Sequence, residues 1–273
     1  MSHVCAIIAG AGHFPRYVAE AAKRQGLRVV AIGLTGRADA TLAQCVDVYE
    51  EVSVGELGRL LERLKAHEAH EAIMAGKVTK DVLFDGRVRF DAEALSIVQR
   101  ATEVSVKGLL GAIGQRLAKD GIRLIDSSTF LKHDLCPAGV LTTRPPTPAE
   151  RLDIQLGVEV ARQLARVDVG QTVVMKQKVV VAVEALEGTD ATIRRAGELA
   201  GRGLVVVKMA SPDQDMRFDL PVLGAATLAV ATASGAHCLA VEAGKSLLLD
   251  REALIAQANE AQISLVGVEP PPG

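Results

Sequence analysis

Residues 171–219 read QTVVMKQKVVVAVEALEGTDATIRRAGELAGRGLVVVKMASPDQDMRFD, and this stretch sets the fold that we expect for the second half of the chain. It contains three apolar runs of strand length and one helix, near residues 172–175, 179–185, 204–208 and 191–200. Strands that alternate with helices are typical of α/β domains, in which helices cover a sheet. The stretch ends in a dense polar run with Asp213, Asp215, Arg217 and Asp219.

Two lysines, Lys176 and Lys178, interrupt the best apolar run. An unpaired buried ammonium is costly, so these lysines need anionic partners. One interpretation is internal, with Glu184 and Glu187 pairing with them across a hairpin. The other is a ligand phosphate, which the free backbone N–H groups of Gly188–Asp190 at a helix start would also bind. We favour the ligand, and alternation along one strand then places both lysines on the same face.

The first half predicts a parallel sheet with helices packed on it, because strands and helices alternate from its start. Strands are expected at residues 4–9, 28–33, 71–75 and 123–125, and helices at 16–25, 54–67 and much of 91–119. Polar loops follow three of these strands, at Gly10–Gly12, Gly76–Thr79 and Asp126–Thr129. Ligands of such sheets bind at the carboxyl ends of the strands, so we expect the three loops at one edge.

The Gly10-x-Gly12 turn after the first strand does not complete a dinucleotide fingerprint. That motif needs a small residue where Pro15 stands and an acid at the end of the second strand, where Leu34 stands. NAD binding is therefore disfavoured. Two interpretations of the loop remain, a plain tight turn and a cradle of backbone N–H groups for a phosphate or sugar.

Residues 132–147 are predicted to form an extended linker, because they show little periodicity and contain Pro145-Pro146. The linker would join a Rossmann-like substrate-binding domain, residues 1–131, to an α/β catalytic domain, residues 148–273. Thr147 and Glu150 form the pattern of a capping box with Pro148 at the first helical position, so a helix is expected from there to about residue 167.

Composition excludes several classes of function. The chain has 273 residues, 49% of them hydrophobic, which suits two domains with a core each. A net charge of −2 and only 3% aromatic residues disfavour nucleic-acid binding. Four scattered cysteines indicate neither a zinc ribbon nor a disulfide framework. We expect no signal peptide and no membrane-spanning helix, and hence a cytoplasmic location.

The carboxylates near the end of the opening stretch suit magnesium-assisted phosphoryl chemistry. Carboxylates hold a hydrated Mg²⁺ ion, and nearby cations neutralise phosphate oxygens. Asp219 directly precedes the apolar run Leu220–Gly224, which argues against a merely solvated loop. Asp215 and Asp219 are therefore the predicted metal ligands.

Several strings resemble the UDP-2,3-diacylglucosamine pyrophosphatases of lipid A biosynthesis, of the type unrelated to calcineurin-like metallophosphoesterases. They are Gln171–Val174, Lys176–Lys178, Glu184–Ala191, Asp215–Pro221 and Ala240–Gly244 in the second half, and Ala9–Pro15, Gly76–Val78 and Asp126–Leu131 in the first. The resemblance covers nearly the whole chain. It implies two α/β domains, Mg²⁺ dependence, and hydrolysis of the substrate to UMP and 2,3-diacylglucosamine 1-phosphate.

Roles follow from the resemblance and from the residue chemistry together. The predicted catalytic residues are Asp219, Asp215 and Arg217, with Asp219 orienting water or holding the metal. The predicted substrate-binding residues are Gly10, Ala11, Gly12, Lys77, Asp126, Thr129, Thr172, Lys176, Lys178, Glu187, Gly188, Thr189, Asp190, Lys208 and Gln214. The partner is a lipid-linked UDP-sugar, with peripheral contact at the cytoplasmic face of the inner membrane; a homodimer is left open. The alternatives are a nucleotide-sugar binding protein without catalysis and, less favoured, an NAD-dependent oxidoreductase.

Overall fold

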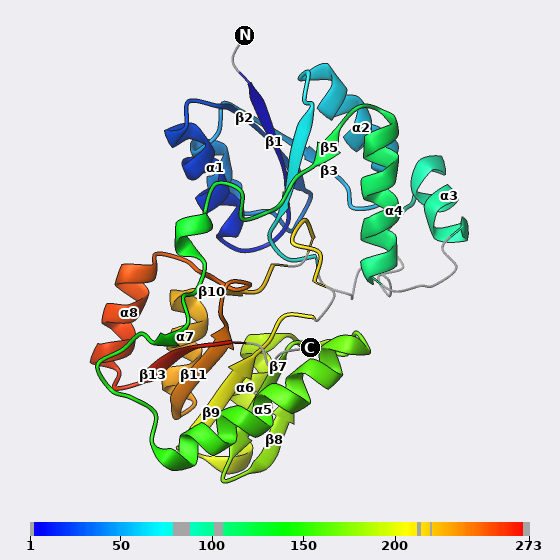
Figure 1. Cartoon of the computed structure of the whole chain (residues 1–273). Coiled ribbons are helices and arrows are strands. Elements are labelled where there is room, and N and C mark those ends of the chain that lie inside the picture. Colours follow the sequence, from blue (N-terminus) through cyan, green and yellow to red (C-terminus); the bar gives the residue numbers. More distant parts are fainter. Residues whose placement is uncertain (1–2, 79–87, 101–105, 212–213, 219, 270–273) are drawn as a thin grey trace. The chain divides into compact units, whose positions relative to one another are not determined.

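The computed structural model describes residues 3–78, 88–100, 106–211, 214–218 and 220–269. The chain divides into two compact units, residues 1–131 with 216–218 and residues 132–215 with 219–273 (Figure 1). Each unit has one main β-sheet covered by helices, so the predicted α/β class is confirmed. Among the described residues, no helix is long and apolar enough to cross a membrane.

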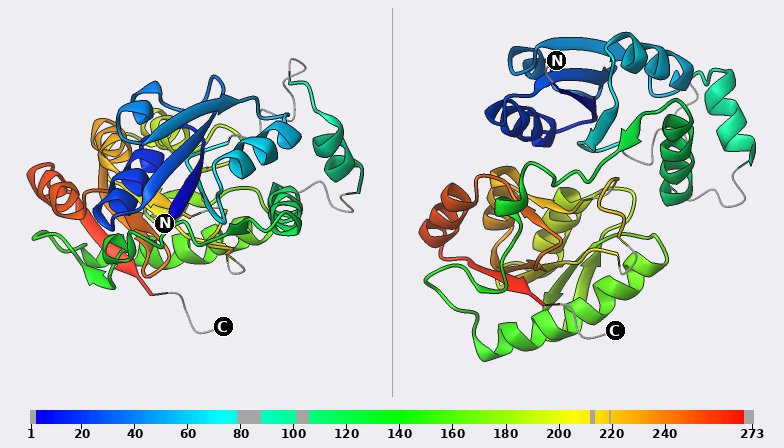
Figure 2. Two further views of the ribbon diagram at one scale, coloured as in Figure 1. Left: turned by 90° about the horizontal axis from the view of Figure 1, so that it is seen from above. Right: turned by 45° about the horizontal axis from the view of Figure 1, so that its top comes forward.

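The first unit is built on a parallel five-stranded sheet in the order β3-β2-β1-β4-β5. Its strands are β1 (Val4–Ala9), β2 (Arg28–Leu34), β3 (Val48–Val52), β4 (Glu71–Ala75) and β5 (Arg123–Leu124). Its helices are α1 (Phe14–Arg24), the 3-10 helix η1 (Ala40–Gln44), α2 (Leu57–Ala66), α3 (Ala92–Arg100) and α4 (Val106–Lys119). Helix α1 covers one face of the sheet, whereas α2 and α4 cover the other (Figure 1, Figure 2). Helices on both faces of a parallel sheet make this unit Rossmann-like.

A short segment from the second half of the chain completes the first unit. The backbone N–H of Ser127 donates to the carbonyl oxygen of Met216 at 2.9 Å. The Ser127 hydroxyl donates to the carbonyl oxygen of Met74 at 2.8 Å, with that of Arg217 at 3.1 Å. Phe218 packs on the core beneath α2 and α4, and a Cβ on Gly114 would lie 3.4 Å from its ring. The first unit is therefore assembled from two separate parts of the sequence.

The second unit contains a mixed six-stranded sheet in the order β6-β13-β11-β9-β7-β8. Its strands are β6 (Gly139–Val140), β7 (Thr172–Lys176), β8 (Val179–Val183), β9 (Leu204–Lys208), β11 (Ala236–Glu242) and β13 (Ser264–Val268). Strands β9, β11 and β13 are parallel, whereas β7 is antiparallel to both β9 and β8. A separate two-stranded sheet pairs β10 (Val222–Leu223) with β12 (Leu247–Leu248).

Four helices cover the two faces of this sheet. They are α5 (Pro148–Arg166), α6 (Thr189–Ala200), α7 (Ala225–Ala233) and α8 (Arg251–Glu260). Helix α5 packs on one face through Ile154, Val158 and Ala161, beside the apolar side chains of β7 and β9. The other three helices share a second core with the opposite face (Figure 2). The buried valines of β7 and β9 thus face helices on both sides, which explains why these strands are apolar throughout.

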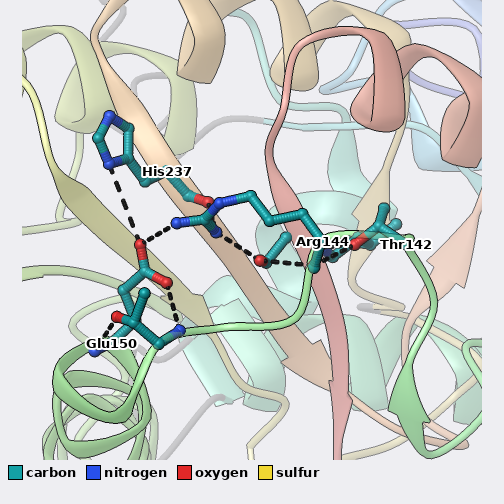
Figure 3. A network of polar contacts seen from close by, with 7 residues as sticks. Thr142, Arg144, Glu150 and His237 are labelled. Carbon is teal, nitrogen blue, oxygen red and sulfur yellow. Dashed lines mark hydrogen bonds and ion pairs between the residues drawn. The ribbon is translucent and has the colours of Figure 1, made fainter.

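Residues 132–147 differ from the predicted extended linker, because they pack as part of the second unit. They contain the 3-10 helix η3 (Lys132–Asp134), and β6 pairs with β13. The Arg144 guanidinium donates to Glu150 at 2.7 Å and to the carbonyl oxygen of His237 at 3.1 Å (Figure 3). Arg144 thus forms its hydrogen bonds within the second unit, whereas in a free linker it would form them with water.

The predicted capping box is confirmed at the start of α5. The hydroxyl of Thr147 accepts from the backbone N–H of Glu150 at 3.2 Å, and the Glu150 carboxylate accepts from the backbone N–H of Thr147 at 2.8 Å. The same carboxylate accepts from Arg144, and its Oε1 lies 4.0 Å from Nδ1 of His237 (Figure 3). Glu150 thus joins the helix start to the chain that enters it.

Candidate active site

Polar side chains gather at one edge of the second sheet. The register pairs Thr172, the first residue of β7, with Lys208, the last residue of β9. The backbone N–H of Glu184, which follows β8, donates to the carbonyl oxygen of Thr172 at 2.8 Å. Helix α6 begins at the same edge with Thr189. We refer to Thr172, Glu184, Thr189 and Lys208 as the Lys208 cluster.

The hydroxyl of Thr189 connects the two charged members of the Lys208 cluster. It accepts a hydrogen bond from Nζ of Lys208 at 2.8 Å and donates one to Oε1 of Glu184 at 2.9 Å. The Thr172 hydroxyl lies 3.4 Å from it. Thr189 is only 3% exposed and Thr172 is fully buried, so little water competes for these contacts. An ammonium and a carboxylate are therefore joined through one ordered hydroxyl.

Glu184 keeps its negative charge within this cluster. Burial would raise its pKa, but the charge of Lys208 and contacts with the hydroxyls of Thr172 and Thr189 outweigh burial and lower the pKa. Its Oε2 atom is buried and accepts no hydrogen bond of normal geometry among the described residues, although Thr172 and the backbone of Gln171 also face the carboxylate. The cluster thus holds one positive and one negative charge in a partly buried place.

The first turns of α6 and α7 are joined beside this cluster. The Thr227 hydroxyl in α7 donates to Oδ1 of Asp190 in α6 at 2.8 Å. Gly188 precedes α6 with φ of 81°, a conformation that favours glycine. Helix N-termini carry unpaired backbone N–H groups and a partial positive charge, so this edge suits an anion. Gly188, Thr189 and Asp190 thus occupy the helix start that the sequence predicts, while ligand binding there stays a prediction.

Glu242 adds a buried carboxylate at the same edge of the sheet. It ends β11, whose residue Val241 is paired with Lys208, and it is 1% exposed. It accepts from the backbone N–H of Ala210 at 3.0 Å and lies 3.3 Å from Nζ of Lys245. Glu242 therefore fixes the start of the polar segment after β9. Sequence reasoning missed this role, although an acid within the apolar run of β11 was a visible signal.

Lys176 and Lys178 lie at the other end of β7. The strand ends at Lys176, and Gln177 and Lys178 form a turn with φ of 50° and 66°. Nζ of Lys176 donates to the carbonyl oxygen of Ala200 at the end of α6 at 2.5 Å. The prediction that both lysines share one face of one strand is wrong, because the chain turns between them. The structure does not bring them to Lys208.

The alternative pairing of these lysines with glutamates is also wrong. Glu187 lies 2.6 Å from Arg195, and its pKa is lowered by its own and neighbouring backbone N–H groups and by Arg195. Glu184 belongs to the Lys208 cluster. Backbone N–H groups of the turn, those of Gln177 and Lys178, donate instead to Asp153 in α5 at 3.0 and 2.5 Å. A buried aspartate that accepts from both N–H groups explains the polar turn.

The predicted catalytic residues fall on the segment between β9 and β10. Asp219 lies outside the described residues. Asp215 belongs to the second unit and Arg217 to the first, where its guanidinium carbon lies 4.8 Å from the centre of the Phe218 ring. Gln214 accepts from the backbone N–H of Ser211 at 3.0 Å through its side chain. No group of three or more metal-binding side chains occurs among the described residues, so the two-aspartate metal site stays a prediction.

The glycine loops of the first unit pack on each other. Strands β1 and β4 are parallel neighbours, and Ala11 and Lys77, in the loops after them, exchange two backbone hydrogen bonds of 2.9 Å. A Cβ on Gly10 would lie 2.6 Å from the carbonyl oxygen of Lys77, and one on Gly76 would lie 2.7 Å from the backbone of Gly10. Close packing of two loops thus explains Gly10 and Gly76 without a ligand. Gly12 has φ of 92°, which favours glycine for a turn.

The third loop of the first unit follows β5, next to β4 in the sheet. Asp126 accepts from the backbone N–H and the hydroxyl of Ser128, both at 2.7 Å, and the Thr129 hydroxyl donates to the Asp126 carbonyl oxygen at 2.6 Å. The three polar loops therefore follow neighbouring strands at one edge, as predicted. Ser127, which the sequence reasoning did not single out, holds the segment 216–218 in this loop.

Comparisons with known proteins agree along the whole chain. A family model described as the LpxI N-terminal domain matches residues 4–133, and one described as the LpxI C-terminal domain matches residues 137–266. A UDP-2,3-diacylglucosamine pyrophosphatase LpxI from Caulobacter vibrioides is 32% identical over 277 residues, which cover 97% of this chain and 97% of that protein.

Similarity to solved structures is weak. The biotin carboxylase domain of the Hydrogenobacter thermophilus 2-oxoglutarate carboxylase is 13% identical over 72% of this chain and 41% of that chain, with a TM-score of 0.27. The biotin carboxylase domain of a single-chain bacterial carboxylase is 13% identical over 78% of this chain and 60% of that chain, with a TM-score of 0.29. Such scores carry no argument about fold or function.

Proposed function

We infer the function from the family, because the chain belongs to the LpxI family, whose two domain models match residues 4–133 and 137–266. The protein is a UDP-2,3-diacylglucosamine pyrophosphatase of lipid A biosynthesis. The observation that carries this conclusion is the 32% identity to the LpxI pyrophosphatase of Caulobacter vibrioides over 97% of both chains. The products are UMP and 2,3-diacylglucosamine 1-phosphate.

The Lys208 cluster and the start of α6 are the proposed site for the diphosphate. Lys208 brings a positive charge to the edge where α6 begins, and electrostatic stabilisation of a phosphoryl group needs such a cation. Lys176 is excluded from this role because it binds the carbonyl oxygen of Ala200 at the opposite end of β7. The loops around Lys77, Asp126 and Thr129 are a proposed binding site of the first unit, since they follow the neighbouring strands β4 and β5 of a Rossmann-like sheet.

Mg²⁺ is the proposed cofactor. Mg²⁺ is commonly held by one or two carboxylates, with substrate phosphates and water as its other ligands. Asp215 and Asp219 are the residues that would hold it, and the ion would supply a Lewis acid for the phosphoryl oxygens.

The rival functions lose support from the contacts of individual residues. An NAD site would need the glycine turn after β1, yet Gly10 is explained by its close contact with Lys77. A nucleotide-sugar binding protein without catalysis remains the alternative that an assay must separate. The location at the cytoplasmic face of the inner membrane is proposed because the product carries two acyl chains.

Incubation of the purified protein with UDP-2,3-diacylglucosamine and Mg²⁺ tests this function. Release of UMP is the expected result, with loss of turnover in EDTA and recovery when Mg²⁺ or Mn²⁺ is added back. UMP release that continues unchanged in EDTA would refute the metal assignment alone. Substrate that binds but stays intact would favour the binding protein.

A further inference from the structure

The contact between Glu184 and Lys208 through Thr189 has a fixed direction. A carboxylate only accepts hydrogen bonds and an ammonium only donates them. The Thr189 hydroxyl must therefore accept from Lys208 and give its one proton to Glu184, at 2.8 and 2.9 Å. Because the Thr189 side chain is almost fully buried and sits on the first turn of α6, its position is set by the helix.

This arrangement restricts a side chain that is otherwise flexible. A lysine has four rotatable bonds, and binding through an unrestrained lysine costs entropy when the ammonium becomes ordered. In this protein the hydrogen bond from Nζ of Lys208 to the hydroxyl of Thr189 restricts the lysine side chain. The same hydroxyl donates to Oε1 of Glu184, so a negative charge is held close to the ammonium group.

We propose that Glu184 and Thr189 are positioning residues that hold the Lys208 ammonium group at the start of α6, ready to neutralise the substrate diphosphate. The inference rests on the proposed function and extends it, because neither Glu184 nor Thr189 needs to touch the substrate. Lys208 is the group that does. The loss of the Thr189 hydroxyl should therefore lower turnover only when Lys208 is present.

A double-mutant cycle tests this dependence. The variants are Thr189→Val, which keeps the shape of the side chain but removes the hydroxyl, Lys208→Met, and the two combined. Loss of one hydrogen bond to a charged group should lower kcat/KM for UMP release by about tenfold in Thr189→Val. In the Lys208→Met background the same change should lower it by less than about twofold, because the residue on which Thr189 acts is gone.

Two further variants separate positioning from folding. Thr189→Ser restores the hydroxyl and should recover most of the turnover that Thr189→Val loses. Thr192→Val removes another fully buried threonine hydroxyl of α6, at 0% exposure, and should lower kcat/KM by less than about threefold. If Thr189→Val does not fold, Glu184→Gln replaces it in the cycle, because the amide keeps the size of the side chain and removes the charge.

The outcomes are distinct. A second tenfold loss from Thr189→Val in the Lys208→Met background would overturn the inference, and so would wild-type turnover in Thr189→Val. Either result leaves the proposed function intact as long as the wild-type protein releases UMP. No UMP from the wild-type protein would instead refute the proposed function itself.

Discussion

Lys208 and Lys176 illustrate how position decides the role of a charge. Lys208 ends β9 beside the start of α6, whereas Lys176 ends β7 and binds the carbonyl oxygen of Ala200 at the end of α6. The first helix end attracts anions and the second attracts cations. The same residue type therefore contacts the carbonyl end of the helix in one case, and in the other it is the residue that we propose for ligand binding.

Substitution of each lysine by methionine should separate these roles. Lys208→Met should lower kcat by about a hundredfold, the scale expected when one stabilising charge is removed from a transition state. Lys176→Met should keep kcat within about threefold and lower the melting temperature by a few degrees, since one helix-end interaction is lost. Steady-state kinetics and thermal unfolding check both. A hundredfold loss of kcat in Lys176→Met with an unchanged melting temperature would contradict the assignment.

Asp219 is the residue whose substitution we expect to lower turnover most. Asp219→Ala should reduce kcat by about a hundredfold or more, because a general base or metal ligand is lost. Circular dichroism should show a melting temperature within a few degrees of the wild type. Near wild-type turnover in this variant would remove Asp219 from the mechanism and leave Asp215 as the predicted metal ligand.

Glu150 should make the stability of the fold depend on pH. Burial would raise its pKa, but hydrogen bonds from Arg144 and Thr147 outweigh burial and lower the pKa in the folded protein (Figure 3). A lowered pKa means that the carboxylate stabilises the fold above the unfolded pKa of about 4.3, and that this stabilisation is lost as the pH falls through the folded pKa.

Thermal unfolding across pH 3–7 checks this for Glu150→Gln. The wild type should melt above the variant at neutral pH, and the difference should shrink below about pH 4. Glu20→Gln is the control, because Glu20 forms an exposed ion pair with Arg16 at 2.7 Å, and exposed pairs contribute little. A difference between wild type and Glu150→Gln that stays constant over this range would refute the role of the charge.

At the scale of single elements, strong local patterns were predictable and weak ones were not. The capping box of α5 and the apolar strands of both sheets follow from residue type and spacing. Strand β13 was missed, although it lies inside the second sheet, because Ser264 and Gly267 dilute its apolar pattern. Ser264 is fully buried, and its hydroxyl donates to the carbonyl oxygen of Arg144 at 2.8 Å. Its partner lies 120 residues away, so no local pattern shows it.

Strand β3 and the turn between β7 and β8 were missed for other reasons. The run Val48–Val52 contains Glu50 and Glu51 and forms an edge strand. An edge strand tolerates charged side chains, so its sequence need not be apolar throughout. In the hairpin, Gln177 and Lys178 adopt positive φ values that glycine or asparagine usually provides. Asp153 compensates by accepting from both N–H groups, and that contact comes from another element. The separation of Lys176 from Lys208 has a different cause, the antiparallel register of β7 and β9, which pairs Thr172 with Lys208.

The segment 216–218 gives the clearest prediction for an element. Phe218→Ala should expose the core beneath α4 and destabilise the first unit by up to about 3 kcal/mol, because an aromatic side chain leaves a cavity. Hydrogen exchange measured by mass spectrometry should show lost protection in α4 and β5. Phe218→Leu should lose less, and Leu199→Ala, whose side chain is 66% exposed, should lose nothing measurable. Unchanged protection in Phe218→Ala would show that the segment does not support this unit.

At the scale of the whole molecule, the chain passes between the two units three times, after residues 131, 215 and 218. Residue patterns predicted two α/β domains but placed one linker between them, because three residues are too few to show a periodicity. The family strings supplied the activity, which residue chemistry alone left open among three functions. The close packing of the two loops explains Gly10 without a bound ligand. The sequence could not distinguish these two explanations, because Lys77 is far from Gly10 along the chain.

The central claim is that this protein hydrolyses the pyrophosphate bond of UDP-2,3-diacylglucosamine with water. The most direct measurement is mass spectrometry of the products after turnover with Mg²⁺ in ¹⁸O-enriched water. We predict equal amounts of UMP and 2,3-diacylglucosamine 1-phosphate, with one ¹⁸O atom in the diacylglucosamine 1-phosphate. Label in UMP would instead place the attack of water on the phosphorus of the uridylate, whereas intact, unlabelled substrate would contradict the claim.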